Sequence, residues 1–184
     1  MENNFFDLIK EEALSVGFSH SGVVEASKIE TDATFRNICA ANHCGGYGGC
    51  WMCPPDIGEI ETLMQEIKSY SYALVYQYIA PLEDSYDYEG MIEAKKKHFA
   101  LSQKLRAVWR EKPVKKQLHL GVGGCGGCDR CAKRDGIPCR KPELAMPSLE
   151  GYGINVARLA ALSGMKYVNE DASVTYFGAV LFSE

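Results

Sequence analysis

Hydrophobic residues recur along the chain with two periods, one typical of helices and the other typical of strands. The helical period predicts helices over residues 5–16, 31–41, 57–70, 90–110 and 154–162. Apolar runs and alternation predict strands over residues 18–26, 72–80, 118–122 and 174–182. The segments 72–80 and 174–182 are nearly continuous apolar runs, which is typical of strands buried on both faces of a sheet.

The order of these elements predicts the class of fold. Strands alternate with helices, which favours an α/β or α+β fold. We expect a mixed sheet of about four core strands with flanking helices. No linker, block of charge or low-complexity run interrupts the sequence. Residues 1–184 are therefore predicted to form a single domain.

Composition and charge exclude several classes of protein. The chain is 46% hydrophobic and 24% charged, which is ordinary for a globular protein. A net charge of −4 argues against nonspecific binding to nucleic acid or anionic membranes, which requires a basic surface. The N-terminus is acidic where a signal peptide is basic, and the most apolar runs are too short to span a bilayer. We therefore expect a cytoplasmic protein with neither a nucleic-acid nor a membrane partner.

Cysteine and glycine are the residues that depart from an average composition, with eight and eighteen copies. The cysteines form two sets, Cys39, Cys44, Cys50 and Cys53, and then Cys125, Cys128, Cys131 and Cys139. Thiols are kept reduced in the cytoplasm, so clustered cysteines bind metal more often than they form disulfides. The sequence therefore predicts two metal-binding loops of four cysteines each, residues 39–53 and 125–139, with disulfides as the alternative.

The spacing of the second set indicates iron–sulfur ligation. Cys125, Cys128 and Cys131 follow one another at Cys-x2-Cys intervals, and Cys139 arrives from further along the chain, much as in ferredoxins. A single zinc ion more often uses two separated Cys-x2-Cys pairs. The wider spacing of the first set suits either metal. We expect two [4Fe–4S] clusters, one at each set, with zinc at one or both sites as the alternative.

Both loops contain the frame Gly-Gly-x-Gly-Gly-Cys-x2-Cys, at residues 45–53 and 123–131. Glycine tolerates positive φ, so successive backbone N–H groups can turn toward sulfides and thiolates. Such hydrogen bonds stabilise a negatively charged cluster and tune its potential. The alternative, that these loops only connect helices and strands, does not explain why the same frame occurs twice.

Four residues outside the cysteine sets are candidates for a supporting role. His43 adjoins Cys44, where it could act as a ligand or as a donor to a cluster sulfur. His98 lies on the apolar stripe of the predicted helix 90–110, where a core histidine is the simpler interpretation and a redox-linked proton group the alternative. Tyr47 and Trp51, within the first loop, could shield its metal from water or could simply pack.

The chain resembles a family of small, cysteine-rich predicted metal-binding proteins of unknown function that occur chiefly in anaerobes. The resemblance runs along most of the chain and is carried by the segments CGGYGGCWMCPP (44–55), PLEDSYDYEGM (81–91), CGGCDRCAKRDGIPCRKP (125–142), MPSLEGYGINV (146–156) and VTYFGAVLF (174–182). It implies a metal, iron–sulfur in kind, and a place in anaerobic redox metabolism. It implies no reaction, substrate or catalytic residue.

Together these observations predict an iron–sulfur protein that transfers single electrons to or from a redox partner protein. Basic residues in the segments 95–97 and 112–116 could dock an acidic electron carrier. One alternative is an iron–sulfur oxidoreductase or an enzyme-activating subunit in which one cluster binds a substrate. A second alternative is a zinc-stabilised interaction module whose metal serves folding alone.

Overall fold

The computed structural model describes residues 2–183. The α-helices in this range are α1 (Glu2–Val16), α2 (Phe35–Ala40), α3 (Ile60–Lys68), α4 (Tyr88–Trp109) and α5 (Val156–Leu162). The strands are β1 (His20–Glu25), β2 (Tyr72–Pro81), β3 (Lys116–Leu120) and β4 (Ser173–Ser183). Short 3-10 turns are η1 (Ala26–Lys28), η2 (Ala132–Asp135) and η3 (Glu150–Tyr152). The predicted order of helices and strands is confirmed.

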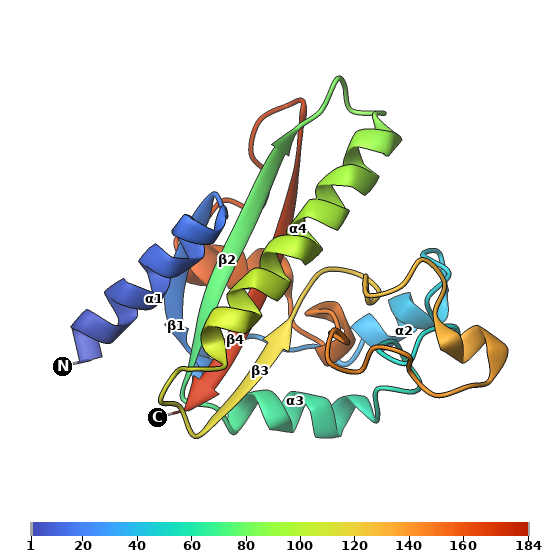
Figure 1. The fold of residues 1–184 in the computed structure, drawn as a ribbon, viewed down its shortest axis with the longest axis horizontal. Helices are drawn as coiled ribbons and strands as arrows, with labels where there is room; N and C mark the ends of the chain where they lie inside the picture. Colours follow the sequence, from blue (N-terminus) through green and yellow to red (C-terminus); the bar gives the residue numbers. More distant parts are fainter. Residues whose placement is uncertain (1, 184) are drawn as a thin grey trace.

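The four strands form one sheet in the order β1-β2-β4-β3 (Figure 1). The two strands predicted to be buried on both faces, β2 and β4, are its two central strands. All three neighbouring pairs are antiparallel, so the fold is the α+β form of the predicted class and the sheet is not mixed in strand direction. The last strand, β4, lies between β2 and β3, and α4 therefore connects two strands that are not neighbours.

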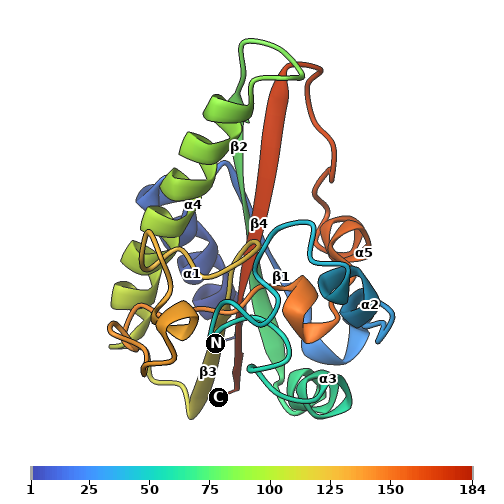
Figure 2. The ribbon, with the colours of Figure 1, turned by 90° about the vertical axis from the view of Figure 1, so that its right-hand side faces the viewer.

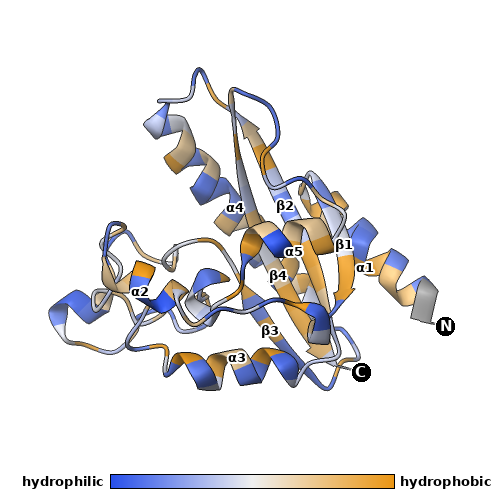
Figure 3. Cartoon of the chain, turned by 180° about the vertical axis from the view of Figure 1, so that it is seen from behind, coloured by the Kyte–Doolittle hydropathy of each residue, from blue (hydrophilic) through white to orange (hydrophobic). Residues whose placement is uncertain are grey.

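Helices cover both faces of the sheet, which gives three layers (Figure 2). The core between the sheet and helices α1 and α4 includes Leu74, Tyr76, Val180 and Phe182. The core between the sheet and helices α3 and α5 includes Ala73, Val75, Ala179 and Leu181. Alternate residues of β2 and β4 thus fill opposite cores, which is why most positions of both strands are apolar. Figure 3 shows the matching alternation of hydrophobic and hydrophilic residues along α1 and α3.

Helix α4 is the longest helix, and its buried stripe includes Leu101, Leu105 and Trp109. The opposite side of the helix is charged, and exposed Lys96 pairs there with Glu93. Such an amphipathic pattern suits a helix that packs on one side of a sheet. Across residues 2–183, no helix combines the length and the apolar character needed to cross a membrane.

Helix α2 is shorter than the helix predicted over residues 31–41. It begins at Phe35, because Thr31 forms an antiparallel bridge with Ile154 and the N–H of Asp32 donates to the carbonyl of Gly153. These long-range contacts keep Thr31 and Asp32 outside the helix, and Ala33 and Thr34 form a turn that leads into it. The helical spacing of apolar residues alone could not indicate them.

Strand β3 also differs from the prediction, which placed it over residues 118–122. The strand begins at Lys116 and ends at Leu120, because Gly121 leaves the sheet and forms a parallel bridge with Ser148. The chain then turns away from the sheet edge into the second cysteine loop.

Candidate metal centre

The two cysteine loops lie together beside the β3 edge of the sheet (Figures 1 and 2). The first loop, residues 39–53, starts in α2 within the long connection from β1 to β2. The second loop, residues 125–139, follows β3 and includes η2. Both loops contribute to the wall of one cavity, although β2, α4 and β3 separate them in the sequence. Because β4 lies between β2 and β3, strand β3 is at the edge of the sheet. The second loop, which follows β3, can therefore reach the first loop.

The repeated glycine frame has partly the same backbone conformation in the two loops. Its first glycine is left-handed in each, with φ of 69° at Gly45 and 60° at Gly123. Only glycine adopts this conformation without strain. A Cβ atom at Gly123 would lie 2.7 Å from the Nζ atom of Lys95, so the end of that side chain would have to shift. The backbone conformations of the two loops differ further along the frame, because Gly48 is left-handed and its counterpart Gly126 is not.

Gly46 allows two thiols to approach the backbone of the first loop. A Cβ atom at this position would lie 3.1 Å from the Sγ of Cys53 and 3.5 Å from the Sγ of Cys44. Both sulfurs therefore border the same small space on one side of the frame. A larger residue at position 46 would occupy that space.

The larger of the two cavities that have at least three cysteines in their walls lies between the loops and has a volume of about 380 Å³. Its cysteines are Cys44 and Cys50 from the first loop and Cys125, Cys128, Cys131 and Cys139 from the second. All four cysteines of the second set therefore border one space, as the prediction of a second-loop centre requires. Cys50, which is 7% exposed, joins them from the other loop. A further cavity of about 280 Å³ has Cys44, Cys125 and His98 in its wall.

The smaller cavity lies on the other side of the first loop and has a volume of about 210 Å³. Its wall contains three cysteines of the first set, Cys39, Cys44 and Cys53. The candidates His43 and Tyr47 also line this cavity. Both side chains thus adjoin the first-loop thiols, and their roles as ligand and as shield stay predictions.

Glu150 also lines the smaller cavity, and the sequence analysis did not identify it. Burial raises the pKa of its carboxyl group. One carboxylate oxygen, Oε2, has no hydrogen-bond partner among the described residues. A single glutamate far from the cysteines in sequence carries no local signal, so only the tertiary structure could place it here.

All eight cysteines are free thiols, so the alternative of disulfides is not realised in the structure. Within residues 2–183, no three His, Cys, Asp or Glu side chains are gathered closely enough to hold a single metal ion. The thiols instead surround the two cavities described above.

Among the described cysteines, Cys50 is the one whose pKa is clearly lowered. A hydrogen bond shared with Cys53 lowers the pKa of Cys50 to about 5, and the backbone N–H groups of Met52 and Cys125 and the thiol of Cys131 act in the same direction. The same shared hydrogen bond, together with burial, raises the pKa of Cys53. The lowered pKa favours the thiolate of Cys50, which is the form of cysteine that binds metals.

An ion pair between the loops holds them together. The Nζ atom of Lys133 in η2 pairs with the carboxylate of Asp56, which follows the first loop, and both side chains are largely buried. The same Nζ atom lies 4.1 Å from the centroid of the Trp51 ring. A cation over an aromatic face is attracted by the electrons of the ring. Lys133 thus contacts two residues of the first loop region at once.

Two hydrogen bonds join the loops at further points. The indole N–H of Trp51 donates to the carbonyl of Ile137 at 3.0 Å. The guanidinium of Arg134 donates to the carbonyl of Gly45 at 2.7 Å. Trp51 therefore bridges the loops as well as lining the larger cavity, so packing accounts for its position and shielding of a metal stays a prediction.

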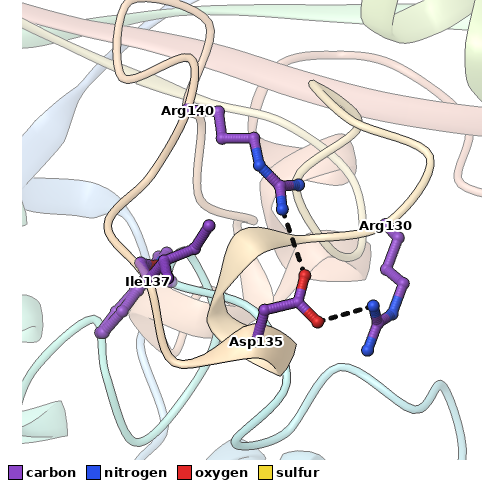
Figure 4. A network of polar contacts seen from close by, with 5 residues as sticks. Arg130, Asp135, Ile137 and Arg140 are labelled. Atoms are coloured by element: carbon purple, nitrogen blue, oxygen red, sulfur yellow. Dashed lines mark hydrogen bonds and ion pairs between the residues drawn. The ribbon is translucent and has the colours of Figure 1, made fainter.

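Further basic side chains surround the larger cavity on the second loop. Asp135 bridges the guanidinium groups of Arg130, at 2.7 Å, and Arg140, at 3.1 Å (Figure 4). Both arginines line the cavity together with Lys141. Exposed ion pairs of this kind add little stability, so their main effect is to hold positive charge around the thiols.

A family model described as predicted metal-binding protein (DUF2284) matches residues 22–182. The chain belongs to this family. The resemblance that the cysteine and glycine motifs indicate is thereby confirmed, and with it metal binding as the described property of the family. No curated protein and no solved structure matches the chain.

In this DUF2284 protein His98 is a core residue, as the simpler interpretation held. The side chain is fully buried among the rings of Phe18, Tyr76 and Tyr176. Neither ring nitrogen has a partner among the described residues. Burial lowers the pKa of His98 to about 3. The imidazole is therefore neutral at physiological pH.

Replacing His98 with phenylalanine is expected to make stability less sensitive to acid. Below pH 6.5 the His98 side chain is protonated in the unfolded chain but stays neutral in the folded protein. The free energy of unfolding therefore falls as pH falls toward 3. This single site contributes a loss of about 2 kcal/mol between pH 7 and pH 5. Denaturant titrations at both pH values should show a smaller loss for His98→Phe by about that amount.

His119, whose pKa burial also lowers to about 3, remains in both proteins and serves as an internal reference. We expect His98→Phe to be at least as stable as the original chain at pH 7, because it removes two unpartnered buried nitrogens. Parallel pH curves for the two proteins would show that His98 is protonated in the fold and contradict its burial as a neutral ring.

Proposed function

We propose that this protein binds two [4Fe–4S] clusters through its eight cysteines and transfers single electrons to or from a partner protein. The observation that carries the proposal is the convergence of the two cysteine loops on two adjacent cavities. Each cavity has at least three thiols in its wall. Following the family resemblance, we place this activity in anaerobic redox metabolism.

The size of the two cavities supports clusters over single zinc ions. Zinc binds four thiolates at about 2.3 Å and draws the sulfurs close around one point. A [4Fe–4S] cluster places each cysteine on a different iron and so keeps the sulfurs further apart. Thiols that surround volumes of about 380 and 210 Å³ fit the larger group.

When bound, such clusters supply one-electron redox chemistry. The residues of this chain bind them, exclude water and set the local charge. The N–H of Cys125 faces the thiols of Cys50 and Cys53, which would stabilise negative sulfur. Burial of Cys50 and Cys53 to 7% exposure keeps water from these two ligands.

The basic side chains around the larger cavity support an acidic electron carrier as the partner. The second loop and the two residues after it contain five basic and two acidic residues, whereas the whole chain has a net charge of −4. The positive charge is thus concentrated at the mouth of one proposed centre. Complementary charge would steer an acidic carrier to this site.

Metal and sulfide analysis of the anaerobically purified protein tests the proposal. We expect about eight irons and about eight sulfides per chain and a brown colour that bleaches on reduction with dithionite. A colourless protein that contains zinc would contradict electron transfer and support the zinc-stabilised interaction module.

A further inference from the structure

The sequence motifs assign one metal centre to each cysteine loop, but the cavities divide the cysteines differently. Cys50 lines the larger cavity with all four cysteines of the second loop and does not line the smaller one. Cys53, three residues away in the same Cys-x2-Cys motif, lines the smaller cavity and not the larger one. The two thiols of this motif therefore border different spaces.

Direct contacts agree with this division. The thiols of Cys50 and Cys53 both face the backbone N–H of Cys125 in the second loop, but of the two only Cys50 also contacts a thiol of that loop, Cys131. The Sγ atoms of Cys53 and Cys44 flank Gly46. Both thiols line the smaller cavity, and Cys44 lines the larger cavity as well. Cys50 and Cys53 also contact each other, so the motif forms the wall between the two cavities.

We propose that Cys50 is one of the four ligands of the metal centre of the second loop, in place of one of that loop's own cysteines, so that the two centres do not follow the two loops. The first centre then retains Cys39, Cys53 and Cys44, the last of which lines both cavities, and the two centres adjoin through the Cys50–Cys53 motif. This assignment rests on the proposed function only in requiring two metal centres. It holds whether the metal is iron or zinc.

The loop contacts explain how the chain achieves this arrangement. The pair Lys133–Asp56 and the hydrogen bond from Trp51 to Ile137 hold the second loop against the residues that flank Cys50 and Cys53. Trp51 follows Cys50 directly, so its bond to the second loop fixes the position of the Cys50 backbone. The second loop is thereby kept within reach of the Cys50 thiol.

Metal counting on pairs of cysteine variants tests the proposal in the full chain, purified anaerobically. Each single variant, Cys39→Ala, Cys50→Ala or Cys131→Ala, should lose one centre and keep about four of about eight irons. The double variant Cys50→Ala/Cys131→Ala should still keep about four, because both residues serve the same centre. The double variant Cys39→Ala/Cys50→Ala should keep almost none.

The reverse pattern, with iron retained in Cys39→Ala/Cys50→Ala and lost in Cys50→Ala/Cys131→Ala, would overturn the assignment. If the alanine variants do not fold, as judged by circular dichroism, serine variants replace them. EPR of the reduced protein should then show Cys50→Ser perturbing the same signal as Cys131→Ser. Perturbation of the signal affected by Cys39→Ser would overturn the proposal.

Failure of the proposed redox function and failure of this division of the cysteines give different results. If the protein holds zinc, the proposed redox function fails, yet the same variants should follow the same pattern with two, one and no zinc ions per chain. If the original chain holds only one centre, or no metal at all, the division of cysteines into two centres is wrong.

Discussion

Removal of the metal is expected to increase amide hydrogen exchange in residues 41–58 and 121–142 at least about a hundredfold, equivalent to about 3 kcal/mol of local stability. Neither core cluster includes a described residue from 39–56 or 121–148. The loops therefore bury little apolar surface to offset the entropy cost of ordering their backbone. Metal binding would supply the missing free energy.

Hydrogen exchange followed by mass spectrometry, on the same preparation before and after chelation, measures this effect. The central strands β2 and β4 provide the control, because both cores pack on them and neither core contains a cysteine of the loops. Their protection should change little. Unchanged exchange in the loops would show that the interloop contacts alone hold them. Loss of protection across the whole sheet would show that the metal holds the entire fold.

Replacing Gly178 with alanine is expected to lower the free energy of unfolding by about 3 kcal/mol. Gly178 of β4 lies opposite Tyr76 of β2. A Cβ atom there would overlap Cε2 of Tyr76 and would lie 2.6 Å from its hydroxyl oxygen. The ring cannot move aside easily, because it is fully buried and packs on Phe18 with ring centroids 4.2 Å apart.

Thermal unfolding should register this change as a fall in Tm of about 10 °C. A double-mutant cycle with Tyr76→Leu supplies the control, since a smaller side chain opposite position 178 removes the collision. The two substitutions together should cost less than the sum of their separate costs. Additive costs would mean that Gly178 is required for a reason other than the ring of Tyr76.

Much of the fold could be predicted from local patterns. The nearly continuous apolar runs of β2 and β4 correctly identified the two central strands, because a strand with cores on both faces buries side chains at successive positions. The predictions were wrong for helix and strand boundaries that depend on residues distant in the sequence. Thr31 pairs with Ile154 and shortens α2, and Gly121 pairs with Ser148 and ends β3. No property of the local sequence encodes these pairings.

The sequence by itself determined that this protein has eight cysteines in two glycine-rich loops and that it belongs to a family of predicted metal-binding proteins. Residue type and spacing suffice to predict metal binding, because they determine which ligand groups the chain can supply. Only the tertiary structure decided which thiols face one another. Strand order brings the loops together at the β3 edge, and contacts such as the ion pair Lys133–Asp56 fix the position of one loop against the other. Cys50 and Cys53 consequently border different cavities despite their adjacency in sequence, because a side chain's neighbours depend on the direction of the backbone and on distant segments.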